Sequence, residues 1–225
     1  MKILNIILSG LFLAVFHVHI VLTSAADLLS AVDASHVNVI RLKRLIAKGV
    51  NVNVQDDEGL TPLMRAVLAE NIEAVALLIE AGADINMKTH EGETAIFLAI
   101  ERDHIEILKL LINAGANVNI QAQYLMTPLM DAVSQNSIEA VSLLIEAGAE
   151  LNDRNDDRKT ALLFAIEAKD KDIAKMLLKN YAEYSIDDQE RVAKQYLRRD
   201  EDIQLKEELL DCYQEHAGWS GYILK

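Results

Sequence analysis

The sequence predicts an all-α solenoid, in which a β-turn and two antiparallel helices form a unit of about 33 residues that recurs along the chain. Identical residues recur at this constant interval in one register, and the segments between them carry apolar residues at helical spacing. Chance is a poor explanation for several columns that keep the same register. The recurring residues are Thr61, Thr94, Thr127 and Thr160; Ala66, Ala99, Ala132 and Ala165; Gly49, Gly82, Gly115 and Gly148; and Asn53, Asn86, Asn119 and Asn152.

Each unit has the local signals of two helices. Thr61-Pro62 and Thr127-Pro128 open first helices, because a threonine hydroxyl can cap N–H groups and proline has no N–H to lose there. The alanine five residues after each threonine is small enough for neighbouring helices to approach closely. Each second helix then stops at Ala-Gly-Ala or a variant of it, in which glycine adopts the left-handed conformation at low cost. These second helices are expected over Ile72–Ile79, Ile105–Ile112, Ile138–Ile145 and Lys171–Leu178.

The strings that carry the period resemble those of ankyrin-repeat proteins. They are Gly59-Leu60-Thr61-Pro62-Leu63, Leu77-Leu78-Ile79-Glu80-Ala81-Gly82-Ala83-Asp84-Ile85-Asn86 and their counterparts in the following repeats. The resemblance covers about residues 27–185 and implies an ankyrin solenoid that binds other proteins. The expected organisation is a signal peptide at 1–26, a degenerate N-terminal capping repeat at 27–53, full repeats at 54–86, 87–119, 120–152 and 153–185, and a C-terminal helical hairpin cap at 186–225.

Three positions depart from the pattern of the family. Apolar residues replace the usual histidine of the first helix; we expect them to pack against the next repeat, a hydrophobic ligand groove being the alternative. The glycine between the two helices is also replaced, and Glu or Lys there should strain the turn. The β-turn glycine becomes Leu125 and Arg158 in the last two repeats, where we expect altered turns. The residues at the first two positions are Met64, Phe97, Met130 and Leu163, and Glu70, Asp103, Asn136 and Lys169.

The N-terminal segment is typical of an export signal. Lys2 precedes an apolar run that ends in the small residues Thr23-Ser24-Ala25-Ala26, which suit cleavage after Ala26. An uncleaved anchor is the alternative, because residues 3–22 approach the ~20 apolar residues that span a bilayer. Under either interpretation the rest of the chain is periplasmic or secreted, and it contacts a membrane only through this segment if the segment is retained.

Residues 186–225 lack the period of the repeats and are expected to form two helices. A solenoid needs a covered end, so a C-terminal cap is the favoured interpretation. The alternative is a partner-binding addition anchored by Trp219, Tyr222 and Ile223. Cys212 is the only cysteine, which excludes an internal disulfide. We expect it to be buried, an exposed thiol being the alternative.

The composition argues against nucleic-acid binding and catalysis. With 22 basic and 35 acidic residues, the net charge of −13 is the wrong sign for phosphate binding and favours a basic partner. The sequence contains no glycine-rich phosphate loop, nucleophile elbow, zinc-binding histidine motif or paired cysteine motif. Acid pairs such as Asp56-Asp57 fall at turn tips, where carboxylates are usually solvated rather than catalytic. We expect no catalytic residues, no cofactor and no metal.

The resemblance places a binding surface on the concave face, which turn tips and first helices form in ankyrin folds. Several tips carry acids, yet Leu60, Tyr124 and Met126 are apolar where a solvated turn would carry polar groups. An acidic rim suits a protein interface, because charge speeds encounter while apolar anchors hold the partner. Tyr124 and Met126 are the first candidates. The full set is Asp57, Glu58, Leu60, His90, Glu91, Glu93, Tyr124, Met126, Asp156 and Asp157.

The expected function is therefore capture of a partner protein outside the cytoplasm, without catalysis. Some extracytoplasmic ankyrin proteins of bacteria are immunity proteins, and the resemblance makes neutralisation of a basic toxin the sharper form of this hypothesis. Two alternatives also come from the resemblance. One is a chaperone-like stabiliser of an exported enzyme such as a catalase, and the other is a secreted effector that acts on host proteins.

Overall fold

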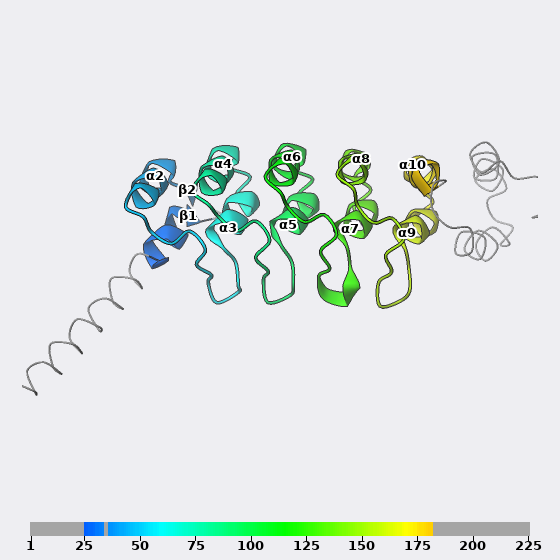
Figure 1. Cartoon of the computed structure of the whole chain (residues 1–225), viewed down its shortest axis with the longest axis horizontal. Coiled ribbons are helices and arrows are strands. Elements are labelled where there is room, and N and C mark those ends of the chain that lie inside the picture. Colours follow the sequence, from blue (N-terminus) through cyan, green and yellow to red (C-terminus); the bar gives the residue numbers. More distant parts are fainter. Residues whose placement is uncertain (1–24, 34–35, 182–225) are drawn as a thin grey trace, which may run out of the picture.

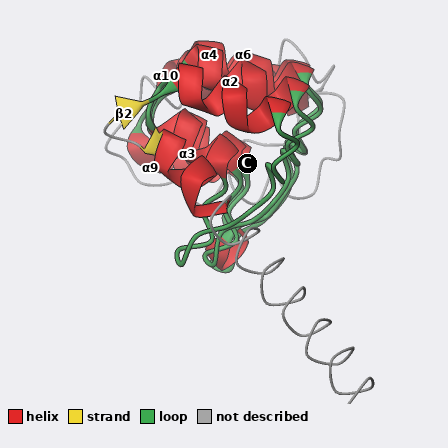
Figure 2. Cartoon of the chain, turned by 90° about the vertical axis from the view of Figure 1, so that its left-hand side faces the viewer, coloured by secondary structure: helices red, strands yellow, loops and turns green. Residues whose placement is uncertain are grey.

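The computed structural model describes residues 25–33 and 36–181, which form a row of stacked helix pairs (Figure 1). The first helices of the repeats make one layer and the second helices make another, as the view along the row shows (Figure 2). The first helices are α3 (Pro62–Leu68), α5 (Ala95–Glu101), α7 (Pro128–Ser134) and α9 (Ala161–Ala168). The second helices are α2 (Val39–Ala47), α4 (Ile72–Glu80), α6 (Ile105–Asn113), α8 (Ile138–Glu146) and α10 (Lys171–Tyr181). The predicted all-α solenoid is confirmed.

Two of the predicted segments fall largely outside the described residues. Most of the export signal and the whole C-terminal hairpin, with Cys212, belong to this group. The predicted cleavage point after Ala26 lies in a helical segment over 25–31. No helix in the described ranges is long and apolar enough to cross a bilayer.

The N-terminal unit is irregular, as its sequence predicts. The helical segment over 25–31 is followed by β1 (Val32–Asp33) and β2 (His36–Val37), which pair antiparallel before α2 begins. This pair of short strands separates the two helices of the unit. Asn38 caps α2 by accepting a hydrogen bond from the Arg41 N–H at 2.9 Å.

The recurring threonines cap first helices. Three of the four accept a hydrogen bond from the N–H three residues later, at 3.2–3.4 Å, whereas the side chain of Thr94 makes no such bond. The recurring glycines follow the second helices with φ between 72° and 92°, in the left-handed region. The local structure thus explains why threonine and glycine recur at these two positions.

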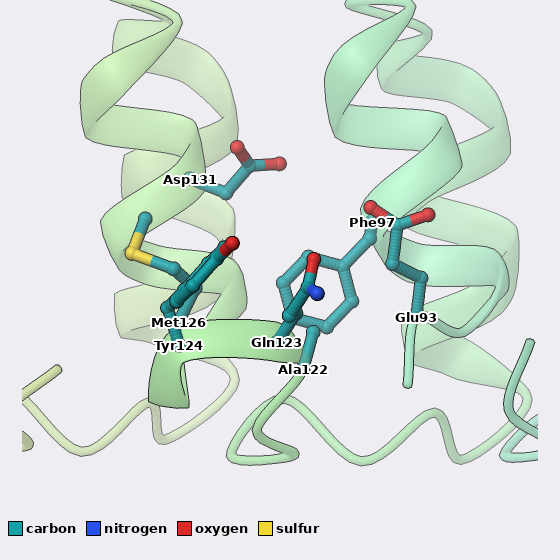
Figure 3. Close-up of a pocket in the computed structure, with 7 residues that line it drawn as sticks. All are labelled: Glu93, Phe97, Ala122, Gln123, Tyr124, Met126 and Asp131. Carbon is teal, nitrogen blue, oxygen red and sulfur yellow. The ribbon is translucent and has the colours of Figure 1, made fainter. Parts of the chain in front are cut away.

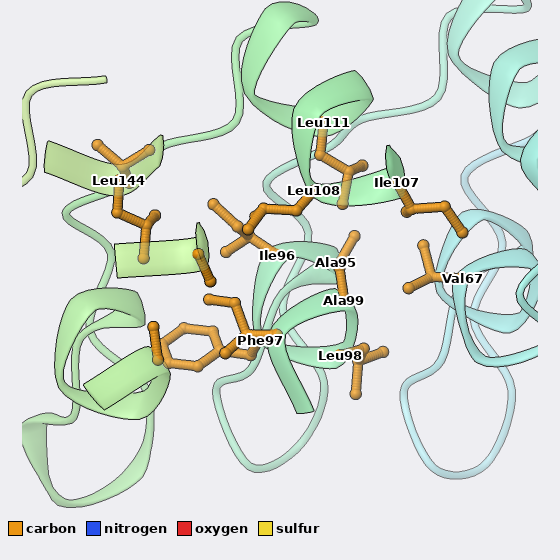
Figure 4. Close-up of a cluster of buried hydrophobic side chains, with 14 of the residues drawn as sticks. Val67, Ala95, Ile96, Phe97, Leu98, Ala99, Ile107, Leu108, Leu111 and Leu144 are labelled. Carbon is orange, nitrogen blue, oxygen red and sulfur yellow. The ribbon is translucent and has the colours of Figure 1, made fainter. Parts of the chain in front are cut away.

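The core is continuous along the row, and the first helices are its most buried part. In α5, every residue from Ala95 to Ile100 is buried, and its side chains meet those of the neighbouring helices (Figure 4). The apolar residues that replace the family's histidine are between 1% and 8% exposed, so the prediction that they pack is confirmed. Phe97 in addition forms one wall of the pocket described below.

The turns between the two helices of each repeat are left-handed, and the strain predicted for Glu70 and Lys169 is confirmed. Glu70, Asp103, Asn136 and Lys169 all have φ between 50° and 59°, in the region that costs residues with a Cβ atom. Asp103 gains a contact from this geometry, because its carboxylate accepts a hydrogen bond from the Ser137 hydroxyl at 2.6 Å. The left-handed residue there also connects one repeat to the next.

The recurring asparagines form a ladder between repeats. The side-chain oxygens of Asn53, Asn86 and Asn119 each accept a hydrogen bond from a backbone N–H of the following repeat, at 2.7–2.8 Å. The Asn side chain has the length that brings its amide oxygen to this N–H, which explains why asparagine recurs in the column. The ladder fixes the spacing of the loops that carry the fingers.

Candidate functional site

The candidate site is the face formed by four finger-like loops and the exposed sides of the first helices. We call residues 56–60, 89–93, 122–126 and 155–159 the first to fourth fingers. Each is closed by a hydrogen bond from the N–H of its first residue to the carbonyl of its last, at 2.8–3.1 Å. All four project from the layer of first helices on the side away from the second helices (Figures 1 and 2).

The predicted site residues occupy two levels of this face. The tip residues are exposed, whereas the residues at the bases of the fingers are half-buried. The exposed group is Asp57, Glu58, His90, Glu91, Tyr124, Asp156 and Asp157, and the half-buried group is Leu60, Glu93 and Met126. Within the described residues, no group of three or more His, Cys, Asp or Glu side chains is arranged to hold a metal ion.

One acid of the first finger serves the fold. Asp56 accepts hydrogen bonds from the Arg65 guanidinium, at 2.8 Å from Nε, and from the N–H groups of Glu58 and Leu60. Although burial alone would raise the pKa of Asp56, these bonds outweigh it and hold the pKa below its usual value. This ion pair is therefore part of the first finger's structure.

The third finger differs from the others. Gln123–Leu125 form a 3-10 turn (η1), and both Tyr124 and Leu125 have positive φ, 58° and 55°. Their side chains are 65% and 45% exposed, in a conformation that glycine adopts at much lower cost. The prediction of an altered turn is correct here, because the finger lacks the glycine of the first two.

The same prediction is wrong for the fourth finger. Arg158 adopts φ 60° and donates its N–H to the Asn155 carbonyl at 2.8 Å. Gly59 makes the equivalent bond to Asp56 at 3.0 Å. The turn is retained at the cost of a left-handed arginine, since Arg158 is exposed and its side chain has room.

The third finger is tied to both of its neighbours. The Gln123 N–H donates to the Glu91 carbonyl at 3.1 Å, and the Asp156 N–H donates to the Tyr124 carbonyl at 3.0 Å. The strained residues are therefore held from both sides by backbone hydrogen bonds. This arrangement keeps the exposed Tyr124 ring at a defined place on the face.

A pocket of about 170 Å³ lies between the second and third fingers, above α5 and α7. Aromatic, aliphatic and thioether groups form its walls, and two carboxylates face it from different repeats (Figure 3). Its lining residues are Glu93, Phe97, Ala122, Gln123, Tyr124, Met126 and Asp131. Three predicted site residues, Glu93, Tyr124 and Met126, thus meet in one place.

The surroundings of the pocket make its two carboxyl groups, Glu93 and Asp131, harder to ionise. Burial and, to a smaller extent, the charges of Glu93 and Glu101 together raise the pKa of Asp131 to about 6, although the hydrogen bond with Gln135 acts in the opposite direction. Burial also raises the pKa of Glu93, with contributions from Glu91 and Glu101. In the described part of the chain, no Lys or Arg forms an ion pair with Glu93 or Asp131.

Sequence reasoning did not identify Asp131 as a site residue. A signal was present, because the repeat register aligns Asp131 with Arg65, Leu98 and Phe164. Asp131 is the one acid in this column, and its side chain is smaller than the other three, so the third repeat differs from its neighbours at this position. The remaining candidates are not brought together, since the tips carrying Asp57-Glu58 and Asp156-Asp157 belong to the first and fourth fingers.

Stacked helix pairs with projecting fingers and an exposed, strained aromatic define a repeat protein that binds through its surface. The chain belongs to the ankyrin-repeat family: the family model for ankyrin repeats (3 copies) matches residues 28–122, 81–155 and 121–188. No curated protein matches the chain. Ankyrin repeats are protein–protein interaction modules and are generally non-catalytic, so the chain is a protein-binding module.

Proposed function

We propose that this protein is exported and captures one partner protein with a basic surface, using the third finger as its anchor. The observation that carries the proposal is Tyr124, 65% exposed and held at positive φ beside a pocket with two carboxylates. Backbone strain at an exposed aromatic indicates a constraint other than stability. Tyrosine at the centre of an interface contributes a large part of binding energy.

The net charge of −13 supports a basic partner, since opposite charge speeds the encounter of two proteins. The sharper form of the proposal is an immunity protein that neutralises a basic toxin. The acidic tips at Asp57, Glu58, Glu91, Asp156 and Asp157 would then meet the toxin's basic surface. Export rests on the apolar segment with its small-residue exit before Asp27.

The test begins with the full chain as bait in extracts of its own cells. The captured protein is then purified and titrated against wild type, Tyr124→Ala and Ile40→Ala. Ile40 is the matched control, because it is 68% exposed and apolar but lies in α2, in the layer of second helices. We expect Tyr124→Ala to weaken binding by tenfold or more, on the order of 1.4 kcal/mol, and Ile40→Ala to leave it unchanged.

The remaining outcomes decide the role. Equal losses for Tyr124→Ala and Ile40→Ala would refute the third finger as the anchor. Co-expression that rescues cells from the captured protein supports the toxin-neutralising form, whereas loss of a captured enzyme's activity on deletion supports the chaperone-like alternative. Fractionation and N-terminal sequencing test export, with a mature chain that begins at Asp27 expected for cleavage after Ala26.

A further inference from the structure

We propose that the pocket between the second and third fingers receives the cationic side chain of one lysine or arginine of the partner. This inference deepens the proposed function and rests on it. The pocket combines a volume of about 170 Å³, two carboxylates from different repeats, and apolar walls, which together match an alkyl stem that ends in a cation.

The walls fit the stem of such a side chain. Phe97 and Met126 line the pocket, and the methylene groups of Lys or Arg pack well against such apolar side chains (Figure 3). The Tyr124 ring stands at the margin of the same space. An aromatic face near a cation adds attraction beyond the packing itself.

The carboxylates fit the charged end. Glu93, at the base of the second finger, and Asp131, on α7, face the pocket from opposite sides (Figure 3). Within the described ranges, neither acid is paired with a basic side chain of the chain itself. Burial and repulsion from neighbouring acids raise the pKa of both carboxyl groups, so a cation from outside gains by relieving that repulsion.

The first repeat shows that a cation fits between a finger and a first helix. The repeat register aligns Asp131 with Arg65, and Ala122 with Asp56. In the first repeat these two positions form an ion pair, with the Arg65 Nε 2.8 Å from the Asp56 carboxylate. In the third repeat, Asp131 stands in place of the arginine and Ala122 stands in place of the acid. The internal cation is thereby lost, and the acid-lined space is open to a partner's side chain.

The other two junctions carry apolar side chains at the position of Asp131. Leu98 stands in the column of Asp131 in the second repeat and is 5% exposed, and Phe164 stands there in the fourth repeat. Leu60 and Met126 stand in the column of Glu93 at these two junctions, so neither junction has an acid there. Of the three described inter-finger junctions, the one between the second and third fingers thus combines the two acids.

The test uses the full chain labelled with ¹³C at the methionine methyl groups. The Met126 methyl reports on the pocket, and the Met64 methyl, 1% exposed in α3, reports on the fold. The probes are n-butylammonium and n-propylguanidinium, with n-butanol as the neutral control of similar size. We expect both cations to shift the Met126 signal saturably, with dissociation constants on the order of millimolar, and n-butanol to bind at least fivefold more weakly.

Substitutions make the test specific. Asp131→Asn and Glu93→Gln should each weaken cation binding at least fivefold, while Glu106→Gln, which neutralises an exposed glutamate of α6 in the layer of second helices, should leave it unchanged. An unchanged Met64 signal shows that each variant is folded. Equal binding of n-butanol, an equal loss in Glu106→Gln, or no saturable shift would overturn the inference.

The two probes also distinguish lysine from arginine, since the tighter of the two names the side chain that the pocket prefers. The result is separable from the proposed function. Saturable cation binding with no partner captured removes the proposed function and leaves the pocket as a cation site. Partner capture that depends on Tyr124, with no cation binding, removes the pocket assignment alone.

Discussion

At the residue scale, Asp131 links the pocket to the stability of the protein. Its pKa rises from the ordinary 3.8 to about 6 in the folded chain, so the folded state holds the proton more tightly than the unfolded state does. Stability therefore falls as pH rises from below 4 to above 6, and the full cost is present at neutral pH. A pKa rise of this size corresponds to about 3 kcal/mol of lost unfolding free energy at neutral pH.

Asp131→Asn removes this cost and should stabilise the protein at pH 7.5 by about 1–3 kcal/mol. The gain should shrink as the pH falls toward 4, where the aspartic acid itself becomes neutral. Urea unfolding at several pH values measures it, with the exposed Asp57→Asn as the control that should change little. A gain that is constant from pH 4 to 7.5 would contradict the titration of Asp131 as its source. The same variant should lose cation binding, which is a trade of function for stability.

Sequence reasoning identified Tyr124, Met126 and Glu93 but not Asp131, the second acid of the pocket. Tyr124 and Met126 are visible as apolar residues in a turn that would otherwise be polar, and Glu93 is visible as one of the acids of the fingers. Asp131 and Phe97 come from first helices, and whether they face a pocket depends on the turn that the third finger adopts. Two consecutive non-glycine residues at positive φ shape that turn, which residue types alone do not indicate.

At the element scale, the turns between paired helices place residues with a Cβ atom in the left-handed region of backbone conformation. The four residues there have positive φ, and they differ in what they contact. Asp103 binds the Ser137 hydroxyl, and Glu70 lies 3.7 Å from His104 across the junction. The strain at Glu70 and Lys169 was predicted correctly, because the period fixes the position and neither residue type favours left-handed geometry. The sequence did not predict that the side chains of Asp103 and Glu70 would reach the next repeat.

Lys169→Gly tests the backbone cost of such a turn. Lys169 has φ 59°, which costs roughly 1–2 kcal/mol for a residue with a Cβ atom, while glycine gives part of this back through the entropy of the unfolded chain. We expect a net stabilisation of about 0.5–1 kcal/mol in urea unfolding. Lys169→Ala, which removes the side chain but keeps the Cβ atom, should show no gain.

The reverse substitution is the second control. Gly82 has φ 82°, and an added Cβ atom there would meet nothing within 4 Å. Gly82→Ala should therefore destabilise the protein by about 1 kcal/mol through backbone strain alone. Stabilisation by Gly82→Ala, or equal effects of glycine and alanine at position 169, would show that these turns are not limited by left-handed geometry.

At the scale of the whole molecule, the fold was predictable because one register repeats. The glycines, threonines and asparagines each mark the same structural event in every unit, so the period alone orders the helices and loops. The binding pocket was less predictable because it forms between repeats, from Glu93 of one and Asp131 of the next. In a solenoid such neighbours are far apart in sequence, and the space between them depends on the packing of several side chains.

The asparagine ladder should control how cooperatively the row of repeats unfolds. Each repeat contacts chiefly its neighbours, so stability is a sum of repeat and interface contributions. Asn86→Ala removes a central inter-repeat bond, the 2.8 Å contact to the Asn117 N–H, whereas Asn53→Ala removes the equivalent bond near the N-terminal end. Each loss should cost about 0.5–1.5 kcal/mol at its own interface.

The two variants should nevertheless differ in urea unfolding. Asn86→Ala weakens the middle of the row, so we expect a lower midpoint and a smaller slope as the two halves begin to unfold separately. Asn53→Ala should fray the irregular first unit and leave the main transition almost unchanged, with faster amide exchange confined to that unit. Equal shifts of the midpoint with an unchanged slope in both variants would mean that the solenoid unfolds as one unit. The asparagine ladder would then not control the cooperativity of unfolding.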